Sequence, residues 1–132
     1  MKRVFLFLSL VFLVLYACRK DELKIDPDNL LIGVWNYAEY QQNTVVYARQ
    51  KAFTQNPGYK FNADGTLTER KNAGWCGTPP VSYADYPGTW TITNDTMLRI
   101  DDGYWGGTMS YTLDIESVTR DSLKVNMIYE LK

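Results

Sequence analysis

The feature that most constrains this chain is a two-residue alternation of apolar and polar side chains in its carboxyl-terminal half. Residues 108–117 place Tyr111, Leu113 and Ile115 on one face and polar side chains on the other, and residues 122–131 repeat the pattern. Successive side chains of a strand point to opposite faces, so this period indicates strands with one buried face. Similar runs of β-branched and aromatic residues recur along the chain, without a convincing helical period. The predicted strands span residues 30–40, 44–54, 59–62, 66–70, 88–93, 97–100, 108–117 and 122–131.

Short turn signals separate most of these strands. Residues 62–65 predict a tight turn, residues 94–95 and 120–121 predict hairpins, and residues 101–107 predict a glycine-rich loop. Only residues 71–87 form a long connection. Consecutive strands joined by short turns pair in antiparallel fashion, and closure of a sheet removes its exposed edges. We therefore predict an all-β fold, an eight-stranded antiparallel up-and-down barrel, with a two-sheet β-sandwich as the alternative.

Residues 1–17 predict a cleaved export signal. Lys2 and Arg3 are followed by an apolar stretch from residue 4 to residue 16, and Ala17 precedes Cys18. A positive start, a short apolar region and a small residue at the boundary are typical of a secretory signal peptide. A transmembrane helix is the alternative reading, but this stretch is shorter than the ~20 residues that cross a bilayer.

The residues around the boundary add a second prediction. Residues 15–18, Leu-Tyr-Ala-Cys, resemble the lipobox of bacterial lipoproteins, although Tyr16 stands where a small residue is usual. The resemblance implies cleavage before Cys18, a diacylglyceryl group on its thiol, and a further acyl chain such as palmitate on the new amino end. Two or three such chains anchor a protein durably in a membrane. Ordinary cleavage that leaves Cys18 as a free thiol is the alternative.

The polar residues 18–29 predict a flexible tether between the lipidated cysteine and a domain formed by residues 30–132. Lys20-Asp21-Glu22 resembles the acidic export tag of surface lipoproteins in the Bacteroidetes, and a plain solvated linker is the alternative. We therefore expect a cell-envelope protein that is lipid-anchored to the outer membrane and faces either the periplasm or the cell surface.

Composition excludes several classes of function. Loss of residues 1–17 removes Lys2 and Arg3 and leaves 12 basic against 15 acidic side chains, a formal charge of −3, so nucleic acid is not an expected partner. The chain has no histidine, which excludes His-based catalysis and His metal ligands. Besides Cys18 it has only Cys76, which we expect to be buried and inert. Asp101 and Asp102 are too few for a calcium loop. We expect no metal, no cofactor and no enzymatic activity, because no nucleophile lies in a catalytic motif.

Several short motifs resemble lipocalins. Gly33-Val34-Trp35 is similar to the Gly-x-Trp of that family, and residues 61–66, Gly88-Thr89-Trp90, residues 111–115 and residues 123–125 resemble the bacterial lipocalin-like domain of Bacteroidetes lipoproteins. The resemblance covers roughly residues 30–131. It implies an eight-stranded barrel that binds a small hydrophobic ligand. The chain lacks the carboxyl-terminal helix of lipocalins, so the resemblance supports the fold more strongly than a particular ligand.

The barrel interior is the first candidate site. An eight-stranded barrel either is filled by its own side chains or holds one small ligand, and both possibilities stay open here. In the second case the inward-facing residues bind a hydrophobic molecule. In Gly-x-Trp the ring plugs the barrel floor, so Trp35, and with it Trp90, also fits a purely structural role. The candidate interior residues are Trp35, Tyr37, Tyr59, Phe61, Trp90, Tyr111, Leu113, Val125 and Met127.

The aromatic loops are the second candidate site. A connection as long as residues 71–87 is unusual in a compact domain and often carries function. Its rings, together with those of residues 103–107, predict an accessory interaction module that binds a glycan or a partner protein. A lid packed on the barrel end is the alternative, because large rings prefer burial. The candidate loop residues are Trp75, Tyr83, Tyr86, Tyr104 and Trp105.

Overall fold

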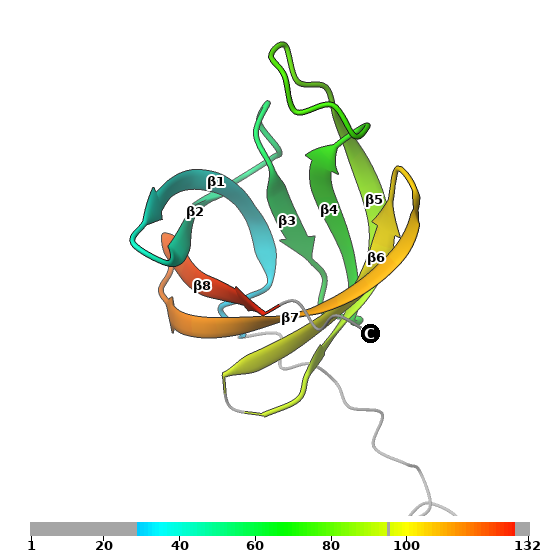
Figure 1. The fold of residues 1–132 in the computed structure, drawn as a ribbon. Coiled ribbons are helices and arrows are strands. Elements are labelled where there is room, and N and C mark those ends of the chain that lie inside the picture. Colours follow the sequence, from blue (N-terminus) through cyan, green and yellow to red (C-terminus); the bar gives the residue numbers. More distant parts are fainter. Residues whose placement is uncertain (1–28, 95, 129–132) are drawn as a thin grey trace, which may run out of the picture.

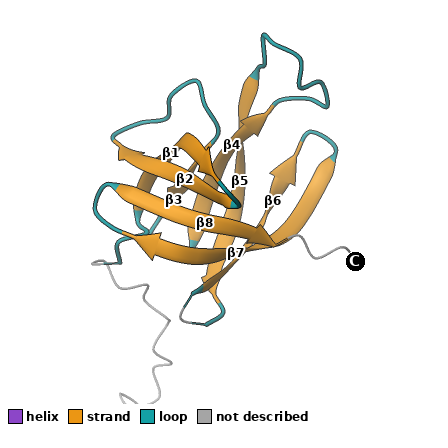
Figure 2. Ribbon diagram, turned by 60° about the vertical axis from the view of Figure 1, so that its left-hand side comes forward, coloured by secondary structure: helices purple, strands orange, loops and turns teal. Residues whose placement is uncertain are grey.

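The structure is a computed structural model that describes residues 29–94 and 96–128, and these residues form strands and loops with no helix (Figures 1 and 2). The predicted signal peptide, Cys18, residues 18–28 of the tether and the last residues of the final predicted strand lie outside the described residues. In the part that is described, no helix has the length and apolar character needed to cross a membrane. The strands are β1 (Gly33–Gln41), β2 (Thr44–Gln50), β3 (Gly58–Phe61), β4 (Thr66–Asn72), β5 (Tyr83–Ile92), β6 (Met97–Tyr104), β7 (Gly107–Val118) and β8 (Ser122–Ile128).

The eight strands close into a barrel in which every neighbouring pair is antiparallel. The order around the barrel is β1-β2-β8-β7-β6-β5-β4-β3, and pairing of β3 with β1 completes the ring. The predicted eight-stranded antiparallel barrel is therefore confirmed, and the two-sheet sandwich is not formed. Figure 1 shows the ring with the β4–β5 loop rising from one end, beside the β6–β7 turn.

One part of the strand order differs from a simple up-and-down ring. Strands β3 to β8 are consecutive neighbours, but β1 pairs with β3 and β2 pairs with β8, so residues 51–57 cross over β1. Asn36 holds this crossover, because its side-chain amide donates to the Ala52 carbonyl (2.9 Å) and its amide oxygen accepts from the Thr54 backbone N–H (3.0 Å). The neighbouring Trp35 points into the core, so the crossover lies on the outer face of β1.

Strands β4 and β5 are longer than the sequence pattern predicted. Strand β4 continues to Asn72 and β5 begins at Tyr83, so the predicted connection 71–87 is reduced to a loop of residues 73–82. Arg70 and Asp85 are partners in this extended ladder, and their side chains form two hydrogen bonds of 2.7 and 2.9 Å. The extension was missed because polar side chains occupy both faces of the extended part of β4, which hides the two-residue period.

One end of the barrel is closed by packed side chains. The Trp35 indole Nε1 donates to the Leu31 carbonyl (2.8 Å), and the Arg49 guanidinium lies 4.2 Å from the centre of the Trp35 ring while it donates to the Ile32 carbonyl (2.7 Å). Gly33 has a φ of 136°, and a Cβ at this position would lie 2.3 Å from the Arg49 side chain, so glycine is required there. The fully buried apolar side chains are Trp35, Tyr59, Phe61, Leu67, Leu98, Ile100, Leu113, Leu123 and Val125.

The described strands share one hydrophobic core. The core residues run from Leu31 to Val125, and all strand ladders lie between Gly33 and Ile128. A domain with its own hydrophobic core folds as a unit. We therefore expect a chain from residue 19 onward, which keeps all eight strands, to fold.

Candidate functional site

The end of the barrel opposite Trp35 is open and holds a cavity of about 630 Å³. Its walls are formed by Trp75 of the β4–β5 loop, by Tyr104 and Trp105 at the β6–β7 turn, and by the methionines Met109 and Met127. Small-molecule sites in proteins have volumes of about 300–1,000 Å³ and occur in the mouths of β-barrels. The barrel is thus filled at one end and hollow at the other, which combines the two possibilities that the sequence left open.

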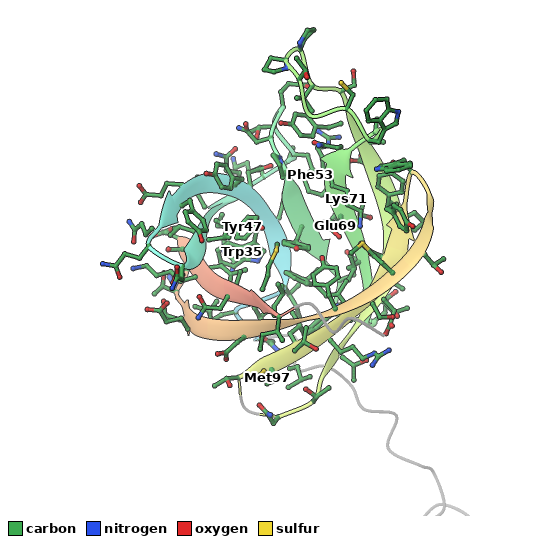
Figure 3. All side chains as sticks on the ribbon, viewed as in Figure 1. Trp35, Tyr47, Phe53, Glu69, Lys71 and Met97 are labelled. Atoms are coloured by element: carbon green, nitrogen blue, oxygen red, sulfur yellow. The ribbon has the colours of Figure 1, made fainter. Side chains whose placement is uncertain are left out.

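A charged network lies at the bottom of this cavity. The Lys71 Nζ lies 2.9 Å from Glu69 Oε2 and 3.0 and 3.1 Å from the two Asp102 carboxylate oxygens. The Tyr111 hydroxyl donates to Glu69 Oε2 (2.8 Å) and lies 2.8 Å from the Tyr59 hydroxyl. Glu69, Lys71 and Tyr111 face the cavity (Figure 3 labels Glu69 and Lys71). Within the described residues, every buried side-chain nitrogen and oxygen has a hydrogen-bond partner.

Strand periodicity places these charges inside the barrel. Glu69 and Lys71 have the same parity on β4 as the core residue Leu67, so they continue its inward-facing row towards the open end. Asp102 pairs with Gly88 of β5, and a Cβ on Gly88 would lie 2.5 Å from the Asp102 Cβ. Gly88 therefore lets the Asp102 side chain enter the interior beside the Lys71 ammonium group.

Burial changes the protonation of the network. The pKa of Glu69 is raised from 4.5 to about 8, first because burial disfavours its charged form and then because of the neighbouring Asp102 carboxylate, while Lys71 opposes this rise. Burial also raises the pKa of the Tyr59 and Tyr111 hydroxyls, which remain neutral hydrogen-bond donors. With a pKa of about 8, the Glu69 carboxyl group is mostly neutral near pH 7, beside the Lys71–Asp102 salt bridge and the two phenols.

The interior residues that the sequence predicted are divided between the two ends of the barrel. Five of them are buried in the packed core and do not line the cavity: Trp35, Phe61, Trp90, Leu113 and Val125. Tyr111 and Met127 line the cavity, and Tyr59 joins its floor through the Tyr111 hydroxyl. Tyr37 does not line the cavity and is 38% exposed, although its ring packs edge-on against the core residue Tyr47, with ring centres 6.5 Å apart. A β-bulge follows Tyr37 on β1, between Tyr37 and Glu39.

The predicted loop residues are divided in a similar way. Trp75, Tyr104 and Trp105 line the cavity, and the two indoles remain 81% and 53% exposed, so they do not form a packed lid. The prediction that Tyr83 and Tyr86 lie in this loop was wrong, because both belong to β5. The Tyr86 ring instead lies 5.5 Å from the Lys71 Nζ.

Sequence reasoning missed Glu69 and Lys71 as site residues. The signal that identifies them is their spacing on β4. They lie two and four residues after the core residue Leu67, so their charged side chains share its inward face. Asp101 and Asp102 lie side by side in the chain but point to opposite faces, and Asp101 pairs with Arg99 at 3.0 Å. Among the described residues, no group of three or more acidic or cysteine side chains is arranged to hold a metal ion.

Cys76 also differs from its prediction. It lies exposed in the loop of residues 73–82 rather than buried in the core. Hydrogen bonds from Thr78 lower the pKa of its thiol. The loop, and not the barrel wall, carries Cys76, because β4 ends at Asn72 and the chain leaves the sheet there.

The fold and the cavity define an eight-stranded antiparallel barrel with one packed and one open end. No protein family matches the chain, and comparisons with curated proteins and with solved structures also gave no match.

Proposed function

We propose that this protein binds a small hydrophobic molecule in the open half of its barrel while lipid on Cys18 anchors it to the cell envelope. The observation that carries this proposal is the cavity of about 630 Å³ with aromatic and methionine walls. Burial of apolar ligand surface against such walls contributes about 25 cal/mol per Å². Methionine side chains adapt to irregular shapes, so Met109 and Met127 suit a flexible apolar chain.

The amino-terminal sequence supports the proposed location. An export signal in residues 1–17, a lipobox ending at Cys18 and a polar tether in residues 18–29 would hold the barrel beside the outer membrane. Hydrophobic molecules are poorly soluble in water. A binding protein held next to the lipid phase therefore shortens the aqueous path along which such a molecule exchanges.

The two exposed indoles favour a second candidate function. Trp75 and Trp105 present large ring surfaces to solvent at the mouth of the cavity. Exposed tryptophans stack on sugar rings and serve as anchor residues of protein interfaces. An accessory module that holds a glycan or an envelope protein through these rings is therefore the alternative.

Native mass spectrometry tests the first function. The chain from residue 19 onward, which keeps the complete barrel, is incubated with a lipid extract from the source cells, and we expect a one-to-one adduct. Met127→Trp fills the cavity with a larger side chain and should abolish the adduct. Met97→Trp is the matched control, because Met97 lies apart from the cavity at the far end of β6 (Figure 3), and it should keep the adduct.

Absence of an adduct from the natural chain, with an intact β-sheet circular dichroism spectrum, would contradict ligand binding in the barrel. The second function is then tested with a glycan array and with pull-down from envelope extracts. The double variant Trp75→Ala/Trp105→Ala should lose any partner captured through the exposed rings.

A further inference from the structure

The cavity floor has more acidic groups than basic groups. Two carboxyl groups, Glu69 of β4 and Asp102 of β6, share one ammonium group, that of Lys71. Among the described residues, this cluster also faces the neutral hydroxyls of Tyr111 on β7 and, behind it, Tyr59 on β3, whose ring lies against Tyr47 of β2. Ionisation of both carboxyl groups therefore leaves one negative charge at the bottom of a cavity with aromatic walls.

The same contacts disfavour an anionic ligand. Lys71 has three N–H donors, and its Nζ already lies within 3.1 Å of oxygens from both carboxyl groups and 3.5 Å from the Met109 sulfur. A carboxylate or phosphate head group at this point would be a third acidic group around one lysine. Like charges this close in a site of low dielectric repel strongly. Within residues 29–94 and 96–128, the floor therefore offers no free cation to an anion.

We propose that the cavity takes a hydrophobic organic ammonium ion, whose cationic head pairs with the Glu69 carboxylate while its apolar chain lies between the aromatic and methionine walls. This inference rests on the function proposed above and names the chemical class of its ligand. The rings of Trp75, Tyr104 and Trp105 at the mouth suit such a ligand, because aromatic faces attract cations as well as apolar groups.

Binding of this ligand is coupled to release of a proton. The raised pKa of Glu69, about 8, means that its carboxyl group is mostly neutral near pH 7. The arriving ammonium group takes the place of that proton as the partner of the carboxylate, and the proton passes to the buffer. The charge balance of the site is unchanged, because one positive charge enters and one leaves. Asp102 and Lys71 remain paired throughout.

Three probes with one tail test the proposal: decylammonium, decanol and decanoate, each below its aggregation limit, titrated into the chain from residue 19 onward. We expect decylammonium to bind at least about tenfold more tightly than decanoate, since a charged hydrogen-bonded pair contributes about 1.5–3 kcal/mol. Equal or tighter binding of decanoate would overturn the cationic class and leave the proposed function standing. Failure of all three probes to bind would contradict the proposed function itself.

Calorimetry in buffers of different ionisation enthalpy adds a second readout. Near pH 7 the natural chain should release close to one proton for each decylammonium bound, and Glu69→Gln should release none. In Glu69→Gln the affinity for decylammonium should fall about tenfold or more, while that for decanol changes less than about threefold. An unchanged preference for decylammonium in this variant, or the absence of proton release in the natural chain, would overturn the role of Glu69.

Discussion

Glu69 illustrates how one residue can carry both the stability and the chemistry of a site. Its carboxyl group lies inside the barrel, where ionisation is opposed by burial and by Asp102 and is favoured by Lys71. The neutral form of Glu69 predominates at pH 7, and a neutral carboxyl group both donates and accepts hydrogen bonds. The raised pKa of Glu69 is therefore a consequence first of its burial and then of the neighbouring Asp102 carboxylate.

The raised pKa predicts a dependence of stability on pH. Glu69 has a pKa of about 8 in the folded protein against 4.5 for the unfolded reference, so its contribution is fully present below 4.5 and is lost as the pH rises to 8. Relative to Glu69→Gln, the free energy of unfolding of the natural protein should fall by roughly 4 kcal/mol between about pH 5 and pH 9. Urea denaturation at each pH measures this difference.

The control for this measurement is Glu39→Gln, which changes an exposed carboxyl group on β1 in the same way. Its pH profile should follow that of the natural protein. Parallel profiles for the natural protein and Glu69→Gln would show that Glu69 ionises as easily in the folded state as in the unfolded chain.

Strand β4 serves two purposes through its two faces. Its inner face changes from the core residue Leu67 to the charged pair Glu69 and Lys71, and this change marks the border between the packed and the open end. Its outer face carries Arg70, which bonds Asp85 on β5 and donates to the Thr54 carbonyl of the crossover (2.9 Å). One strand thereby fixes both the cavity floor and the unusual strand order.

The crossover of residues 51–57 depends on Asn36, which is almost completely buried under it. Asn36→Ala removes the hydrogen bonds to the Thr54 backbone N–H and to the Ala52 carbonyl, and each such bond contributes about 0.5–1.5 kcal/mol. We expect a loss of about 1–3 kcal/mol in urea denaturation. Asn56→Ala in the same segment, where the side chain is exposed, should cost less than about 0.5 kcal/mol. Similar losses in both variants would contradict the role given to Asn36.

At the scale of the whole molecule, the two ends of the barrel differ in how completely side chains fill them. The packed end holds Trp35, Phe61 and Trp90, with the Arg49 guanidinium over the Trp35 ring, and the open end holds the cavity. The packed end stabilises the closed ring. The open end contributes less van der Waals attraction, because side chains that line a cavity lack contact atoms on one side.

This difference between the two ends predicts that truncation of two cross-strand partners lowers the free energy of unfolding by unequal amounts. Leu113 and Met127 face each other in the β7–β8 ladder, but Leu113 is completely buried and Met127 lines the cavity. Leu113→Ala should lower the free energy of unfolding by about 3 kcal/mol, and Met127→Ala by about 1 kcal/mol, since it only enlarges an existing cavity. Urea denaturation of both variants checks this, and equal costs would mean that the cavity end is packed like the core.

The sequence by itself determined the class of the fold. A two-residue period with short turns predicts antiparallel strands, and such strands form either a closed barrel or two stacked sheets. It also identified Trp75, Tyr104 and Trp105 as candidate site residues, and these aromatic residues surround the cavity mouth. Tertiary structure decided the pairing of β1 with β3, the meeting of Glu69 and Asp102 at one lysine, and the end that stays open. Local periodicity states which residues share a face of a strand. It does not state which strands become neighbours or how far side chains fill the space between them, because both depend on contacts between residues that are distant in the chain.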